Sequence, residues 1–238
     1  MTTAEPGQRL DALDLGLAAL ALGAGVMDAL GFLALGGALP SAMTGNTALL
    51  GLALGRGDLA AAAPPFTAAV GFALGVASAT FIDHRLAKGR VVRAPAPVIA
   101  WLLILEACLL ACFALGWQAV GRPAAGPALY LLILLGAGGT GIQSFAARKI
   151  GRSGVTTVVF TSTLTALVAA VTTAFLRRPL RFDSDARRQG ATYLAYLLGA
   201  VAGGFLAWHG DVIIAFLPPA AAVLAAALHG ASARVSWP

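Results

Sequence analysis

Long apolar segments restrict the fold of this 238-residue chain more than any other feature. A helix needs about 20 mostly apolar residues to cross the ~30 Å hydrocarbon core of a bilayer. Six segments meet that length, at residues 15–37, 64–83, 96–118, 127–147, 190–208 and 211–229. Only 11% of the residues are charged, against roughly 25% in soluble domains. The sequence therefore predicts an all-α, polytopic membrane helix bundle that forms a single domain over residues 1–238.

Two further segments are ambiguous. Residues 41–55 are too short to cross a bilayer and begin with the polar string SAMTGNT. Residues 155–176 are long enough to cross, but they are rich in threonine and lie between two basic clusters. Each segment either spans the membrane or enters it and leaves on the same side.

The basic residues favour the second arrangement. Cytoplasmic loops of membrane proteins carry an excess of Lys and Arg, and 12 of the 16 basic residues fall into three clusters, at residues 85–93, 148–152 and 177–188. Six crossings with re-entrant segments at 41–55 and 155–176 place all three clusters and both termini on one side. We therefore expect a bacterial cytoplasmic (inner) membrane protein whose termini both face the cytoplasm.

An internal repeat is consistent with this topology. The segment from Gly71 to Phe81 resembles that from Ala195 to Phe205 in its aromatic, Gly and Phe positions. Upstream, residues 23–25 resemble residues 136–138, and Gly31 aligns with Ser144. The two copies cover residues 15–119 and 127–229. With three crossings in each half, the second copy is inverted relative to the first.

Two carboxyl groups lie deep in predicted spans. Ionisable groups inside a bilayer are costly and are rarely present without a function. Asp28 and Glu106 are therefore candidates for a proton relay, and Asp28 also for solute binding. A structural alternative for Glu106 is a hydrogen bond to a neighbouring helix. Asp83, at the end of its span, is most simply an interfacial residue paired with a cation.

The polar string is the most specific local motif. A helix that begins at Thr44, Gly45, Asn46 and Thr47 would offer free N–H groups and a partial positive charge to a solute. Candidate residues from the second half are Gln143, Ser144 and Thr161. Discontinuous helices that meet near the membrane midplane are a recurrent transporter site. The alternative is that the amide and hydroxyls only cap helices or bond to their own helix backbone.

Other chemistries lack support in the sequence. The two cysteines have only Glu106 nearby as a further ligand, so we expect no metal site and no cofactor. The basic clusters indicate topology and not nucleic-acid binding. No hydrolase, nucleotide-binding or metalloprotease motif is present. An intramembrane enzyme would require Asp28 and Glu106 to approach each other, and we expect that the chain is not an enzyme.

Asp28-Ala-Leu-Gly31-Phe32, followed by MTGNT and a Gly-rich short helix, resembles the YoaK-like family of bacterial membrane proteins, a family of unknown function. The resemblance extends over most of the chain, including the Gly-x-Gln-Ser stretch that ends at Ser144. It implies a multi-pass membrane protein with a polar focus at the MTGN string. It implies no substrate.

The leading hypothesis is therefore a transporter or channel for a small solute of unknown identity, driven by protons through Asp28 and Glu106. The alternative is a membrane scaffold or partner subunit that transports nothing. The lipid bilayer is the expected environment in both cases, and assembly into a homo-oligomer is left open.

Overall fold

The computed structural model describes residues 10–88, 96–120, 123–151, 160–176, 184–210 and 212–235. These residues form helices and no strands, which confirms the all-α prediction. The α-helices are α1 Ala12–Ala34, α2 Met43–Gly55, α3 Leu59–Lys88, α4 Ala96–Ala119, α5 Gly126–Ile150, α6 Phe160–Leu176, α7 Ser184–Trp208 and α8 Leu217–Val235. A 3₁₀ turn, η1, at Ile213–Phe216 directly precedes α8.

Six of these elements are long and apolar enough to cross a bilayer, namely α1, α3, α4, α5, α7 and η1 with α8. They match the six predicted spans, with changed ends. α1 begins three residues earlier than predicted, because Asp11 and Asp14 form a capping box at its start. It also ends three residues earlier, just before Gly36 and Gly37, whose φ values are positive. α3 begins before Pro64 and Pro65, where the side chain of Asp58 accepts a hydrogen bond from the N–H of Ala61.

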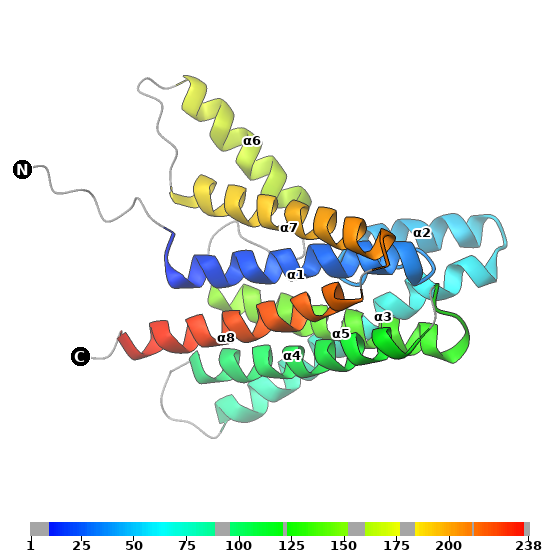
Figure 1. Ribbon diagram of the computed structural model, residues 1–238. Coiled ribbons are helices and arrows are strands. Elements are labelled where there is room, and N and C mark those ends of the chain that lie inside the picture. The colour runs from blue at the N-terminus through cyan, green and yellow to red at the C-terminus, as the bar shows by residue number, and fades with distance from the viewer. Residues whose placement is uncertain are drawn as a thin grey trace, which may run out of the picture.

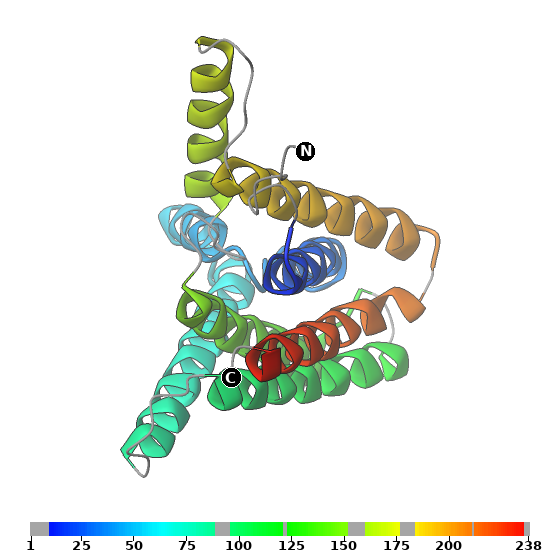
Figure 2. The same cartoon turned by 90° about the vertical axis from the view of Figure 1, so that its left-hand side faces the viewer.

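The long helices lie roughly parallel in one bundle (Figure 1). α1 packs along α7 and α8, and α5 packs along α3 and α4. α4 and α8 also contact each other, and this contact joins the two groups. α2 packs on α3 alone and α6 on α7 alone within the described residues. Figure 2 shows α6 projecting away from the remaining helices.

Close helix contacts depend on glycine. A methyl group on Gly25 of α1 would overlap the backbone carbonyl of Tyr196 in α7, and one on Gly199 would overlap that of Leu22. On the other side of the bundle, a methyl group on Gly75 of α3 would overlap the carbonyl of Gly138 in α5. Small residues at such positions let membrane helices approach closely.

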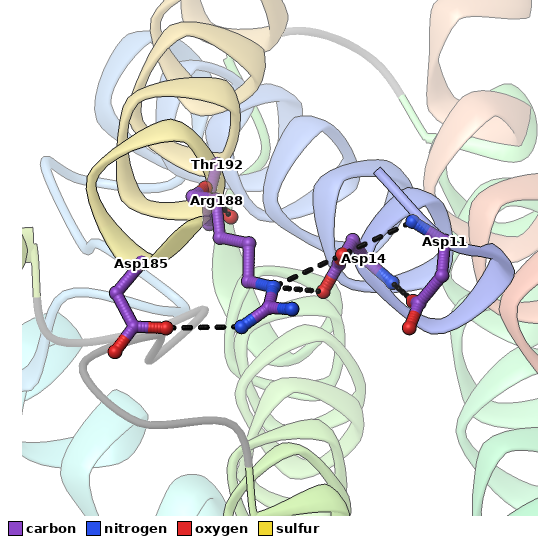
Figure 3. Close-up of polar contacts among 5 residues, drawn as sticks. All are labelled: Asp11, Asp14, Asp185, Arg188 and Thr192. Atoms are coloured by element: carbon purple, nitrogen blue, oxygen red, sulfur yellow. Dashed lines mark hydrogen bonds and ion pairs between the residues drawn. The ribbon is translucent and has the colours of Figure 1, made fainter. Parts of the chain in front are cut away.

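Ion pairs hold the helices together at one end of the bundle. The Arg188 guanidinium, near the start of α7, lies 3.0 Å from the carboxylate of Asp14 in α1 and 2.9 Å from that of Asp185 (Figure 3). Lys149, near the end of α5, pairs with Asp83 of α3, as the interfacial interpretation of Asp83 predicted. We call this end of the bundle the ion-paired end. α1 begins there and α8 ends there (Figure 1).

Candidate functional site

The segment between α1 and α2 turns back into the bundle. We call residues 35–42 the linker. Gly36 and Gly37 have φ values of +65° and +78°, a left-handed backbone that glycine adopts without strain, and there the chain reverses. The linker then packs against Gly31 of α1, where a methyl group would overlap the carbonyl of Ala38. The chain thus returns along the helix that it has just left.

The carboxylate of Asp28 holds the far end of the linker. It accepts hydrogen bonds from the backbone N–H of Ser41 at 2.7 Å and from the Ser41 hydroxyl at 2.6 Å. The hydroxyl of Tyr196, on α7, donates a third bond at 2.7 Å. Asp28 is 4% exposed and Ser41 is 1% exposed. We call Asp28, Ser41 and Tyr196 the Asp28 cluster.

Side chains of two more helices hold the neighbouring linker residues. The Asn46 amide, on α2, donates to the Leu39 carbonyl at 2.6 Å and accepts from the Leu39 N–H at 2.9 Å. The Thr140 hydroxyl, on α5, donates to the Pro40 carbonyl at 2.6 Å. Residues 39, 40 and 41 are therefore each bound by a side chain from a different helix.

This arrangement fixes the depth at which α2 begins. Asp28 lies six residues before the end of α1, which is about 9 Å along the helix axis. Because Ser41 contacts Asp28, α2 starts inside the bundle and not at its surface. It then runs outward beyond the end of α1, where the chain turns into α3 (Figure 1). The polar string of the sequence marks this buried helix start.

The remaining residues of that string lie in different surroundings. Gly45 packs against the side chain of Leu39, and Asn46 is buried. Thr44 and Thr47 are exposed, and the Thr47 hydroxyl donates to the Met43 carbonyl of its own helix. The structural alternative for threonine thus applies to Thr47, whereas Asn46 binds the linker.

The second-half candidates are only partly brought to this place. Gln143 and Ser144 are buried on α5, and Gln143 donates to the Leu20 carbonyl of α1 at 3.1 Å. Thr161 belongs to α6, but its side chain lies outside the described residues. In the parts of the chain that the structure describes, α6 makes no contact with α2.

Glu106 lies in a different environment from Asp28. Its helix, α4, packs on α5 and α8 and not on α1, so the two carboxyl groups do not form a pair. Glu106 is fully buried, and neither of its carboxyl oxygens has a hydrogen-bond partner among the described residues. The hydrogen bond to a neighbouring helix that the sequence left open is therefore not formed here. Nor do any three His, Cys, Asp or Glu side chains of the described ranges gather as metal ligands.

Comparison with known proteins places the chain in a family. A family model described as "Protein of unknown function (DUF1275)" matches residues 16–229. The chain belongs to this family. It is also 33% identical over 192 residues to the UPF0700 transmembrane protein YoaK of Bacillus subtilis (strain 168), an alignment that covers 78% of this chain and 80% of the relative. No solved structure matches the chain.

Membership in the DUF1275 family confirms the resemblance that the sequence motifs indicated, and the transmembrane relative agrees with the six spans. The matched range begins within α1 and ends within α8, so it includes the linker and the Asp28 cluster.

Three contributors to the site were absent from the sequence prediction. Ser41 stands in the polar string but was not distinguished from its neighbours. Tyr196 is 168 residues from Asp28 in sequence, and Thr140 is 100 residues from Pro40. A tyrosine or threonine in an apolar segment is too common to be selected without the fold. The buried carboxylate at Asp28, which needs donors, was the available indication.

Proposed function

We propose that this protein moves a small solute across the bacterial cytoplasmic membrane, as a transporter or channel whose polar site surrounds the Asp28 cluster. The observation that supports this most strongly is the linker. Three consecutive non-helical residues inside a helix bundle are bound by polar side chains of α1, α2 and α5. Irregular backbone at membrane depth occurs where it is buried in protein or lines a wet cavity, and transporter sites are commonly built from such interrupted helices.

An inverted repeat forms part of the proposal. Exchanging the two halves of the chain exchanges the observed helix contacts in pairs. The packing of α1 on α7 corresponds to that of α5 on α3, and the packing of α1 on α8 to that of α5 on α4. The short helices follow the same rule, α2 on α3 and α6 on α7.

The glycine contacts support one register for this repeat. Gly25 meets the carbonyl of Tyr196, and Gly141 meets that of Phe72 in the same manner. This register is shifted by three residues from the sequence alignment of α1 with α5, the first helix of each half. It pairs Asp28, and not Gly31, with Ser144, since both lie three residues beyond these glycines.

In this register Phe72 is the counterpart of Tyr196. The second half therefore carries a hydroxyl and a phenyl ring where the first half carries a carboxylate and a phenol. On this account Asp28 of the first half binds a proton, whereas its counterpart in the second half, Ser144, supplies only a neutral contact.

The orientation follows from the charges. Arg85, Arg148 and Arg188 stand at the ends of α3 and α5 and at the start of α7. Ion pairs join the end of α3 to the end of α5, and the start of α7 to the start of α1. By the positive-inside rule this end faces the cytoplasm. Both α1 and α8 then have their terminal ends on the cytoplasmic side.

Proton coupling has a physical route through Asp28. Its carboxylate accepts hydrogen bonds from the Ser41 N–H, the Ser41 hydroxyl and the Tyr196 hydroxyl, which suits the ionised form. The oxygen Oδ2 accepts from both the Ser41 and the Tyr196 hydroxyls, so a proton on Oδ2 would require one of these hydroxyls to turn. Proton binding would thus weaken the hold of Asp28 on the linker at Ser41 and the contact of Asp28 with Tyr196 of α7. Glu106, buried without a partner in the described structure, is the second proposed proton carrier.

Transport can be tested in proteoliposomes that contain a trapped pH indicator. A panel of small polar solutes is added under an imposed proton gradient, with wild type, Asp28→Asn and the control Thr80→Val, whose exposed hydroxyl bonds only to its own helix. We expect at least one solute to move protons in wild type and in the control but not in Asp28→Asn.

If no solute moves with wild type, and the protein is recovered from membranes only within a larger complex, the scaffold function replaces the transporter. If a solute moves protons equally well with Asp28→Asn, the Asp28 cluster has no part in coupling.

A further inference from the structure

A groove opens between α3 and α4, away from the Asp28 cluster. Its volume is about 340 Å³, which lies in the range of small-molecule sites. We call it the α3/α4 groove. It is lined by Gly71, Leu74, Gly75, Ser78, Leu105, Leu109, Leu134, Gly138 and Ile142. Apart from the Ser78 hydroxyl, every side chain that lines it is apolar or absent.

The packing of the three helices explains the groove. Gly75 brings the backbone of α3 onto that of α5 at Gly138, whereas α3 and α4 barely touch each other. α5 therefore forms the floor, and the gap between α3 and α4 opens sideways. All three helices are candidate membrane spans, so the opening faces the hydrocarbon of the bilayer.

Two basic residues continue the groove toward the ion-paired end. Arg85 is seven residues beyond Ser78 on α3, and Lys149 is seven residues beyond Ile142 on α5. Seven residues are two helical turns, so each basic residue stands on the same face of its helix as the groove residue before it. Lys149 pairs with Asp83, and Arg85 stacks 4.8 Å over the Phe81 ring. The local net charge of Asp83, Lys149 and Arg85 is therefore +1.

The length of this track matches one lipid leaflet. From Gly71 to Arg85 the track extends 14 residues, or about 21 Å along α3. One leaflet, with its headgroup region, is half of a bilayer about 40–45 Å thick. The apolar part of the track lies at the depth of the acyl chains, and the basic part lies at the depth of the headgroups.

We propose that the α3/α4 groove binds an anionic phospholipid, with one acyl chain along Gly71 to Ser78 and the phosphodiester at Arg85 and Lys149. A single phosphodiester charge complements the local charge of +1. Basic pockets between membrane helices are known to take lipid headgroups. The binding site does not depend on the transport function.

The test is a lipid titration of the detergent-purified protein, followed by native mass spectrometry. The probes are phosphatidylglycerol and phosphatidylcholine with the same acyl chains. One basic residue near an anionic headgroup contributes about a fivefold preference. We therefore expect wild type to bind phosphatidylglycerol about fivefold more tightly or better, and Arg85→Gln to bind the two lipids equally. Arg56→Gln, at the opposite end of the bundle, is the matched control and keeps the preference.

A second pair of variants tests the acyl chain. Ser78→Phe fills the groove and should weaken the binding of both lipids, whereas Ala73→Phe, on the same helix but outside the groove, should not. Ser78, Ala73 and Arg85 are exposed, so none of these changes removes a buried side chain. Equal binding of the two lipids by wild type, a preference that survives Arg85→Gln, or full binding by Ser78→Phe would each overturn the proposal.

Discussion

At the scale of single residues, the burial of Asp28 could be predicted but its partners could not. A carboxyl in the middle of an apolar segment must find donors or a wet cavity, and this follows from the sequence alone. Which donors it finds depends on the turn at Gly36 and Gly37, which brings Ser41 back to the carboxylate, and on the contact of α1 with α7, which brings Tyr196.

Tyr196 gives the first prediction. Tyr196→Phe removes one donor from a buried carboxylate, so the free energy of unfolding should fall by about 1–2 kcal/mol. Unfolding in a denaturing-detergent titration measures it. Tyr130→Phe, at a more exposed tyrosine, should leave the midpoint unchanged. An unchanged midpoint for Tyr196→Phe would mean that the phenol contributes nothing to the hold on Asp28.

Glu106 gives the second prediction, in which stability and function separate. Its oxygens have no hydrogen-bond partner among the described residues, and replacing a buried unpartnered polar group by an apolar one of similar size removes a desolvation cost. Glu106→Leu should therefore raise the unfolding midpoint, and it should abolish proton movement in proteoliposomes. A lower midpoint would show that the carboxyl has a stabilising partner.

At the scale of elements, the apolar spans were predicted well because membrane insertion depends on length and hydropathy. The ends of helices were predicted less well, since local caps decide them. The start of α1 depends on Asp11 and Asp14, and the early start of α3 depends on Asp58. Residues 155–159, the start of the predicted segment 155–176, lie outside the described structure, and α6 covers the rest.

The close contact of α1 and α7 gives the third prediction. Gly25→Ala places a methyl group into the Tyr196 backbone, which cannot move without separating the helices. The free energy of unfolding should fall by about 1–3 kcal/mol. Gly204→Ala, on α7 where a methyl group meets no atom within 4 Å, is the matched control and should be neutral or slightly stabilising. Equal effects of the two variants would show that this helix contact is looser than described.

The ion pair of α1 with α7 gives the fourth prediction (Figure 3). Asp14 has a side chain only 2% exposed, so Arg188→Met removes the Arg188 charge from beside a buried carboxylate. A loss of about 1–3 kcal/mol is expected in the same titration. Asp185→Asn removes the other acid, which is 44% exposed, and should cost little. Equal losses would contradict the dominant role of the buried acid.

At the scale of the whole molecule, charge patterning predicted an arrangement that is consistent with the helix packing. The ion pairs bring the ends of α3 and α5 together, and the starts of α1 and α7. The sequence could not supply the register of the proposed repeat, because Ala, Leu and Gly recur too often for an alignment to decide between positions one turn apart. The overlap of single glycines with single carbonyls does distinguish them.

The central claim is that both short helices enter the membrane and leave on the side from which they came. Single cysteines at Ser153, Ser184 and Gly57, in a background in which Cys108 and Cys112 are replaced, can be probed with a membrane-impermeant thiol reagent. The account predicts that Ser153→Cys and Ser184→Cys react only from the cytoplasm and Gly57→Cys only from outside. Reaction of the Ser153→Cys and Ser184→Cys variants from opposite sides would show that the segment between them spans the membrane, and would contradict the inverted repeat.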